Sequence, residues 1–160
     1  MIHCEFENGN KGSLRHATVN ALVLKDNKIL LGLRGTLNGK PILESGKWGL
    51  LGGFMDRDET LKQAIEREIM EESGWRVENL KLLTIIDRPD RPCEDRQNLS
   101  FVYIADAKEK IQEHDEEVSK LEWFDLDNLP EEDLIAFDFY ESLQLYKKYL
   151  KENLTLPILE

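Results

Sequence analysis

The sequence predicts an α/β protein in which helices pack on the faces of a mixed β-sheet. Short segments rich in apolar and β-branched residues recur along the chain, at 18–24, 29–34, 80–87, 99–105 and 120–124. Two segments with helical spacing of apolar residues, 60–73 and 137–150, are separated by several of these strands. The length of 160 residues fits one domain with its own core, so we expect residues 1–160 to form a single domain.

The first half of the chain predicts a loop followed by a hairpin. Residues 7–16 contain Gly9, Gly12 and Ser13 and read as a loop. The strands at 18–24 and 29–34 flank Asp26-Asn27, a pair typical of turns. Residues 35–47 are rich in Gly, Asn, Lys and Pro, and they predict a long, mobile loop.

The second half carries the two helices. Residues Thr60 to Ser73 are good helix formers, and Gly74 follows as a natural C-cap. Residues 87–97 read as a loop that carries several Arg and Pro residues. The helix at 137–150 places four apolar residues near one face, namely Phe139, Leu143, Tyr146 and Leu150.

Charge and composition narrow the classes of function. The formal net charge of -11 disfavours nucleic acid as a partner, and a phosphate-bearing substrate would need a divalent cation to screen the repulsion. The chain has no run of 18 apolar residues and no signal-peptide pattern at its N-terminus, so we expect a cytoplasmic protein with no membrane partner. Cys4 and Cys93 match no metal spacing, and we expect free thiols, although one disulfide remains open.

The helix at 60–73 carries acidic residues on its apolar side. On a helical wheel, Glu68 and Glu72 fall in the sector of the apolar residues, and Glu71 lies on its flank. The apolar residues of that sector are Leu61, Ala64, Ile65 and Ile69, and the predicted solvent side is Lys62, Gln63, Glu66 and Ser73. Burying carboxylates is costly unless they are paired, and one neighbouring guanidinium, that of Arg67, cannot neutralise three of them.

A bound divalent cation would compensate that cost. Magnesium prefers oxygen ligands and commonly bridges carboxylates to substrate phosphates, so Glu68, Glu71 and Glu72 form a candidate magnesium site. The alternative is an acidic last turn that protrudes into water. Gly52-Gly53, a few residues before the helix, favours the metal site because glycine lets the backbone approach an ion or phosphate closely.

These residues form one long pattern. Gly53 is followed after five residues by Glu59, and after seven more by Arg67-Glu68-Ile69-Met70-Glu71-Glu72-Ser73-Gly74-Trp75. The pattern resembles the signature of the Nudix hydrolase family at every fixed position. Leu51 stands where many members have proline, and Trp75 where an aliphatic residue is usual. Neither position supplies a ligand, so we expect small shifts of loop geometry only.

The resemblance implies a fold, a reaction and a set of roles. The fold would be an α/β/α sandwich around a mixed β-sheet, and the reaction hydrolysis of a nucleoside diphosphate linked to another group. Glu71 and Glu72 match the metal-binding pair, with Mg²⁺ or Mn²⁺ as the cofactor, and Glu68 matches a further ligand or general base. Arg67 and Glu59 match residues that orient these glutamates. The carbonyl of Gly52 or Gly53 matches a backbone ligand.

A carboxylate outside the helix could complete the site. Family members often draw such a residue from a later loop, and the candidates here are Glu116 and Glu117. A solvated acidic loop is the alternative, and it is at least as good an interpretation for Glu116. We favour Glu117 as the functional residue.

Residues on several loops could bind the substrate. Three arginines could bind the phosphates of a substrate, namely Arg34, Arg88 and Arg91, although most arginines only balance the surface charge. The segments around Arg88 and at 135–138 resemble Nudix members that hydrolyse ADP-ribose, but that branch often has histidine where Phe139 stands. Three aromatic residues could stack on a base or belong to the core, namely Trp48, Phe54 and Tyr103.

The leading hypothesis is therefore cleavage of ADP-ribose to AMP and ribose 5-phosphate. Alternative substrates are nucleoside triphosphates, dinucleotide polyphosphates and other nucleotide sugars. The alternative from another class is a non-catalytic nucleotide-sensing domain. A homodimer is an open option, because the apolar tail at 154–159 could pack on a second copy of the chain.

Overall fold

The computed structural model describes residues 2–91 and 98–159, so Cys93 lies outside the described residues. In chain order the elements are β1 (Ile2–Glu5), β2 (Lys11–Leu14), β3 (Ala17–Lys25), β4 (Lys28–Arg34), β5 (Thr36–Leu37), β6 (Lys40–Pro41), β7 (Trp48–Gly49), β8 (Leu51–Phe54), α1 (Leu61–Ser73), β9 (Trp75–Ile86), β10 (Leu99–Lys110), β11 (Val118–Asp125), the short 3-10 helix η1 (Glu132–Leu134) and α2 (Phe139–Glu152).

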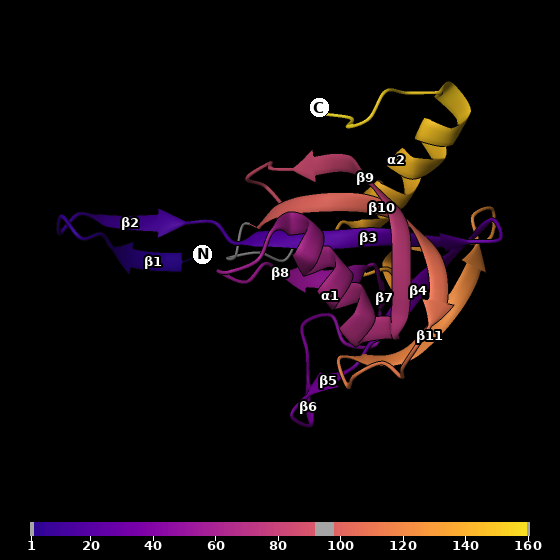
Figure 1. Ribbon diagram of the computed structural model, residues 1–160, viewed down its shortest axis with the longest axis horizontal. Helices are drawn as coiled ribbons and strands as arrows, with labels where there is room; N and C mark the ends of the chain where they lie inside the picture. Colours follow the sequence, from indigo (N-terminus) through magenta and orange to yellow (C-terminus); the bar gives the residue numbers. More distant parts are fainter. Residues whose placement is uncertain (1, 92–97, 160) are drawn as a thin grey trace.

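The main sheet is mixed and lies between the two α-helices. Its strands follow the order β11-β4-β3-β10-β9, with β7 paired to β4 and β8 paired to β3. The β3–β10 pair is parallel and the other pairs are antiparallel. Helices α1 and α2 pack on opposite faces (Figure 1). This arrangement confirms the expected α/β/α sandwich around a mixed sheet.

Strand β3 distributes its side chains between the two faces. Val19, Ala21 and Val23 join the core cluster that contains the buried residues of α1. Leu22 points to the opposite face and joins the cluster that contains α2. Asn20 occupies this second face by the same alternation and is buried, with 5% of its surface exposed. The central strand therefore presents a buried polar residue on the α2 side of the sheet.

Helix α1 begins and ends as its sequence predicts. Thr60 and Gln63 form a capping box at the N-terminus, and Gly74 adopts the left-handed conformation, with φ 73°, at the C-terminus. The prediction that Ser73 faces solvent is wrong, because Ser73 is fully buried and its hydroxyl donates to the Ile69 carbonyl. The segment after β10 covers this last turn, where Ile111 N–H donates to the Gly74 carbonyl.

Several boundaries differ from the sequence prediction. Residues 7–16 do not form only a loop, because β1 and β2 pair as an antiparallel hairpin that projects from the body of the molecule (Figure 1). Residues 35–47 contain the short β5–β6 pair. Strand β9 starts at Trp75 instead of residue 80, and pairing with the long β10 stabilises its polar first half. Helix α2 begins at Phe139, two residues later than predicted.

The C-terminal tail packs on its own chain. Ile158 N–H donates to the Leu83 carbonyl, and Leu156 and Ile158 contact the core cluster on the α2 side. The tail therefore gives no support to a second copy as its partner, and the homodimer stays a prediction. None of the helices in the described residues is long and apolar enough to span a membrane.

The close contact at Gly74 gives a stability prediction. A Cβ at this position would overlap the carbonyl oxygen of Gln112, in addition to the cost of a positive φ. We expect Gly74→Ala to lower the free energy of unfolding by about 2 kcal/mol or more, measured by urea denaturation. Gly39 also has a positive φ, 71°, but open space around it, so Gly39→Ala should cost only about 1 kcal/mol. Equal losses for the two variants would contradict this account of the helix end.

Candidate active site

Three glutamates occupy the last turns of α1, and they differ in burial. The side chain of Glu68 is 14% exposed and that of Glu71 is 49% exposed. Glu72 is buried, and its Oε2 accepts a hydrogen bond of 2.6 Å from Gly52 N–H. Burial raises the pKa of Glu72 well above its ordinary value, and burial is also the main cause that raises the pKa of Glu68. Two carboxylates are thus held in surroundings that disfavour their charged form.

Arg67 connects the glutamates to one another. Its Nε and Nη2 donate to the two oxygens of Glu59 at 3.0 and 2.6 Å. Its Nη1 donates to Glu68 Oε1 at 2.8 Å and to Glu71 Oε2 at 3.1 Å. The hydrogen bond from Arg67 lowers the pKa of Glu59, which therefore stays ionised and holds the guanidinium in place. This geometry suits the orienting role expected of Arg67 and Glu59.

Gly52 and Gly53 allow α1 to approach the sheet. They lie in β8, opposite Asn20 and Val19 of β3. A Cβ on Gly53 would lie 2.6 Å from Oε2 of Glu68, and a Cβ on Gly52, where φ is 145°, would overlap the Val19 carbonyl oxygen. Glycine is required at Gly52, where a side chain would collide with the backbone of the neighbouring strand, whereas a side chain at Gly53 would displace the carboxylate of Glu68.

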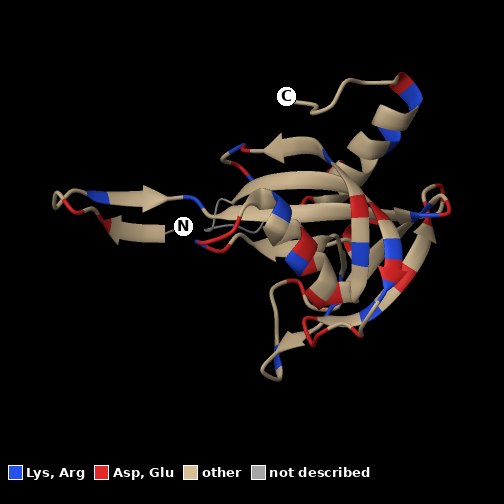
Figure 2. Ribbon diagram, viewed as in Figure 1, with Lys and Arg blue, Asp and Glu red and all other residues tan. Residues whose placement is uncertain are grey.

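The loop before β11 brings a fourth carboxylate to the end of α1. Asp115 N–H donates to the Glu71 carbonyl, which docks this loop on the helix. Burial raises the pKa of Glu117, and the negative charges of Asp115 and Glu71 add to the effect. Figure 2 shows acidic residues gathered on the lower part of α1 and on the adjacent loop. Glu116 instead accepts a hydrogen bond from Asn38 N–H at 2.8 Å, so its carboxylate fixes the β5–β6 turn.

The donor set fits a hard divalent cation. Among residues 2–91 and 98–159, no three carboxylate, imidazole or thiol groups already converge at coordination distance. Arg67 Nη1 occupies the space between Glu68 and Glu71, so small side-chain movements would be needed to bring all ligands to one ion. All candidate ligands are oxygens, and two of them are carboxylates with raised pKa values, the buried Glu72 and the partly buried Glu68. Such groups are the ones that a bound Mg²⁺ or Mn²⁺ would stabilise in their charged form.

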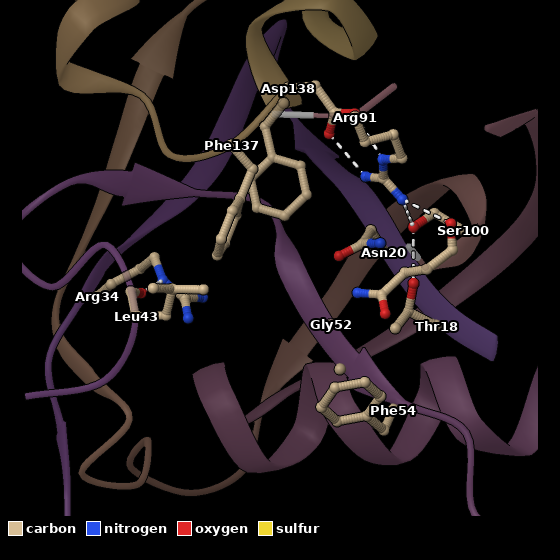
Figure 3. Close-up of a pocket in the computed structure, with 13 residues that line it drawn as sticks. Thr18, Asn20, Arg34, Leu43, Gly52, Phe54, Arg91, Ser100, Phe137 and Asp138 are labelled. Carbon is tan, nitrogen blue, oxygen red and sulfur yellow. Dashed lines mark hydrogen bonds and ion pairs between the residues drawn. The ribbon is translucent and has the colours of Figure 1, made fainter. Parts of the chain in front are cut away.

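A pocket opens on the other side of β8, towards α2 (Figure 3). The backbone of Gly52 and Gly53 forms the wall that the pocket shares with the acidic cluster. Phe54 and Phe137 contribute aromatic faces, and Figure 3 shows Asn20 between them. The other lining residues are Thr18, Arg34, Leu43, Arg91, Asn98, Ser100, Asp138 and Phe139.

The structure brings two of the three candidate arginines to this pocket. Arg91 forms a two-pronged ion pair with Asp138, with both N–O distances 2.7 Å, and also donates to Ser100 Oγ at 2.7 Å. Arg34 donates to the Leu43 carbonyl at 2.8 Å. Arg88 does not line this pocket, because it pairs with Glu141 at 2.9 Å in a separate hollow between β9 and α2.

The family model for the NUDIX domain matches residues 14–145. The chain belongs to the Nudix family. An ADP-ribose pyrophosphatase of Methanocaldococcus jannaschii is 34% identical over 131 residues, which are 82% of this chain and 72% of that protein. The enzyme class is accordingly a Nudix pyrophosphohydrolase.

Other similar proteins carry names that point to other activities. A NAD-capped RNA hydrolase of Klebsiella pneumoniae is 38% identical over 87 residues, which are 54% of this chain. Those residues are only 32% of that longer protein. The crystal structure of a MutT NUDIX hydrolase from Burkholderia pseudomallei superposes with a TM-score of 0.70 and 29% identity, over 83% of this chain and 98% of that one. The family is therefore clear, whereas the relatives do not agree on one substrate.

The sequence interpretation missed several residues of this Nudix pocket. Asn20 and Asn98 line it, and neither was a candidate, whereas Phe137 was noted only as part of the segment 135–138. A polar residue in the middle of the apolar strand at 18–24 was the available signal for Asn20. Of the three aromatic candidates, Phe54 lines the pocket, whereas Trp48 packs edge-on against Phe124 and Tyr103 packs in the α1-side core.

The burial of Glu72 gives a second prediction. Without metal, Glu72→Gln should raise the free energy of unfolding at pH 8 by about 1 kcal/mol or more, because it removes a buried carboxylate. A carboxyl group whose pKa is raised in the folded state destabilises the protein as the pH rises past the pKa of that group in the unfolded state. The difference in the free energy of unfolding between Glu72→Gln and the natural protein should therefore shrink at pH 5.

Urea denaturation in EDTA at both pH values measures this effect. Exposed Glu66 supplies the matched control, and Glu66→Gln should change stability little at either pH. A Glu72→Gln variant that is less stable than the natural protein at pH 8 would show that the buried carboxylate is compensated within the metal-free fold.

Proposed function

We propose that this Nudix enzyme hydrolyses ADP-ribose to AMP and ribose 5-phosphate with Mg²⁺ or Mn²⁺. One observation carries the proposal: buried carboxylates and an aromatic, amide-bearing pocket lie on the two sides of Gly52-Gly53. A diphosphate at this glycine wall would face the acidic cluster, and its nucleoside would extend into the pocket. The name of the Methanocaldococcus jannaschii relative supports ADP-ribose as the substrate.

The acidic cluster supplies the metal ligands and a base. In the proposed site Glu68, Glu71 and Glu72 would hold the cation with the carbonyl of Gly52 or Gly53. The bound cation would screen the diphosphate and lower the pKa of a water molecule. Either Glu68 or Glu117 accepts the proton of the attacking water, because each is a carboxylate with a raised pKa at the cluster.

Arg67 and Glu59 act in this proposal by positioning. The guanidinium holds one oxygen of Glu68 and one of Glu71, and Glu59 fixes the guanidinium by two hydrogen bonds. Catalysis depends strongly on such positioning, since displacement of a reacting group by about 1 Å can cost about 100-fold in rate. Arg67→Lys keeps the charge but loses the planar fork that spans these partners.

The three arginine candidates receive different roles. Arg34 is the proposed phosphate contact, because it lines the pocket and its positive charge acts on both Glu72 and Glu117. Arg91 shapes the far wall through its ion pair with the buried Asp138. Arg88 remains a predicted substrate contact that lies outside the pocket, where it pairs with Glu141.

A substrate panel tests the proposal. ADP-ribose, NAD, nucleotide sugars, diadenosine polyphosphates and nucleoside triphosphates would be incubated with Mg²⁺ or Mn²⁺, and the products separated by chromatography. We expect ADP-ribose to give the highest kcat/KM, with AMP and ribose 5-phosphate as products, and no turnover in EDTA. Preference for a triphosphate or a dinucleotide would retain the metal site and reject ADP-ribose.

Substitution of a metal ligand completes this test. Glu71→Gln should reduce kcat by about 100-fold or more, because even residues that only support a ligand commonly contribute 10- to 100-fold. Glu66→Gln, on the exposed face of the same helix, should leave kcat unchanged. Metal-dependent binding of ADP-ribose without turnover by the natural protein would favour the sensing domain over the hydrolase.

A further inference from the structure

Asn20 is a buried residue whose amide faces the pocket and makes no hydrogen bond within the described part of the chain. It lies in β3 between Val19 and Ala21, and only 5% of its surface is exposed. Its neighbour on the same face, Thr18, is satisfied by a hydrogen bond of 2.6 Å with Ser100. Within residues 2–91 and 98–159 the Asn20 side chain makes no such bond. Burying an unpaired amide is costly, and nearly all buried polar groups in folded proteins have a partner.

A second unpaired amide oxygen lies in the same pocket. Asn98 Oδ1 is buried and has no hydrogen-bond partner among the described residues. Asn98 lines the pocket together with Asn20, just before β10, the strand that pairs with β3. Two unpaired amides at one pocket indicate that their partner is the molecule that fills it.

The other polar groups of the pocket are already paired. Arg91 uses its guanidinium on Asp138, Ser100 and the Asn98 carbonyl. Thr18 and Ser100 bond to each other. Apart from Arg34, the proposed phosphate contact, the capacity for hydrogen bonds with a ligand is therefore concentrated on the two amides.

The walls of the pocket favour a flat ligand. Phe54 is 41% exposed and Phe137 lines the opposite side, with the Arg34 guanidinium 4.9 Å from the Phe137 ring centre. Figure 3 shows the Asn20 amide directed into the space bounded by Phe137 and Gly52. Aromatic faces suit a stacked heterocycle, and an amide between them would meet the edge of its ring.

We infer that Asn20, together with Asn98, recognises the adenine ring of the substrate and is the main determinant of base specificity. A carboxamide offers one donor and one acceptor side by side, which match the exocyclic amino group and an adjacent ring nitrogen of adenine. Asn98 Oδ1 is enclosed beside the pocket, and a turn of this side chain would let it accept the second proton of the amino group. A 6-oxopurine such as hypoxanthine would place an acceptor oxygen against this acceptor. The inference rests on the proposed function for the position of the nucleotide.

Discrimination between adenine and hypoxanthine tests the inference. The kcat and KM values for ADP-ribose and for its inosine counterpart would be measured for the natural enzyme, Asn20→Ala, Asn20→Asp and Asn98→Ala. Asn128 is exposed and does not line the pocket, so Asn128→Ala is the matched control. Urea denaturation of each variant shows whether it is folded.

The natural enzyme and the control should prefer ADP-ribose by about tenfold or more in kcat/KM. Asn20→Ala should raise the KM for ADP-ribose with little change in kcat, and bring the two substrates close to parity. Asn20→Asp should have the same effect, because it keeps the shape but loses the donor. Asn98→Ala should lose part of the preference for ADP-ribose over its inosine counterpart. The inference would be overturned if Asn20→Ala left the preference for ADP-ribose unchanged, or if it lowered kcat/KM equally for both substrates.

Product binding separates this inference from the proposed function. Calorimetry with Mg²⁺ would compare AMP and IMP as ligands of the same proteins. If the natural protein fails to hydrolyse ADP-ribose yet binds AMP more tightly than IMP, and Asn20→Ala removes the difference, the recognition stands and the reaction is wrong. If it hydrolyses ADP-ribose but binds both nucleotides equally, the reaction stands and the recognition is wrong.

Discussion

The close approach of the last turns of α1 to β8 is the constraint on which the site depends. Glu72 is buried against the amide of Gly52, and Glu68 lies so near Gly53 that a methyl group there would collide with its carboxylate. The helix thus places negative charge where water is largely excluded. This arrangement opposes folding unless something compensates it, and the compensation that the geometry allows is a divalent cation held by oxygen ligands.

Charge compensation within the fold is only partial. Arg67 donates hydrogen bonds to Glu59, Glu68 and Glu71, and two of these bonds go to Glu59. The guanidinium therefore positions the glutamates but does not neutralise all of their charge. Glu72 receives a single backbone hydrogen bond from Gly52. The two glycines of β8 then separate this acidic half from the pocket on the α2 side, while keeping the two close enough to act on one molecule. The proposed metal site and the proposed nucleotide pocket therefore lie on the two sides of one strand.

The sequence predicted the acidic half better than the pocket. Glu68, Glu71 and Glu72 follow from helical spacing on a single element, because local periodicity determines which face they share. The side of Ser73 was predicted wrongly, because the segment that follows β10 covers that turn. Asn20 and Asn98 line the same pocket only because β3 pairs with β10 in parallel, and no local sequence pattern determines this pairing. Arg88 and Arg91 lie three residues apart on one loop, yet Arg88 pairs with Glu141 and more distantly with Asp138, whereas Arg91 pairs closely with Asp138 and lines the pocket. Their positions therefore depend on tertiary packing.

The central claim is that one diphosphate lies at Gly52-Gly53, between the metal ligands and the nucleoside pocket. A crystal structure with Mg²⁺ and a methylene-bridged, non-hydrolysable analogue of ADP-ribose tests it most directly. The account predicts metal density bonded to oxygens of Glu68, Glu71 and Glu72 and to the analogue, with the adenine ring between Phe54 and Phe137 beside Asn20. Ligand density in the hollow beside Arg88 and Glu141, or a cation that contacts none of the three glutamates, would contradict it.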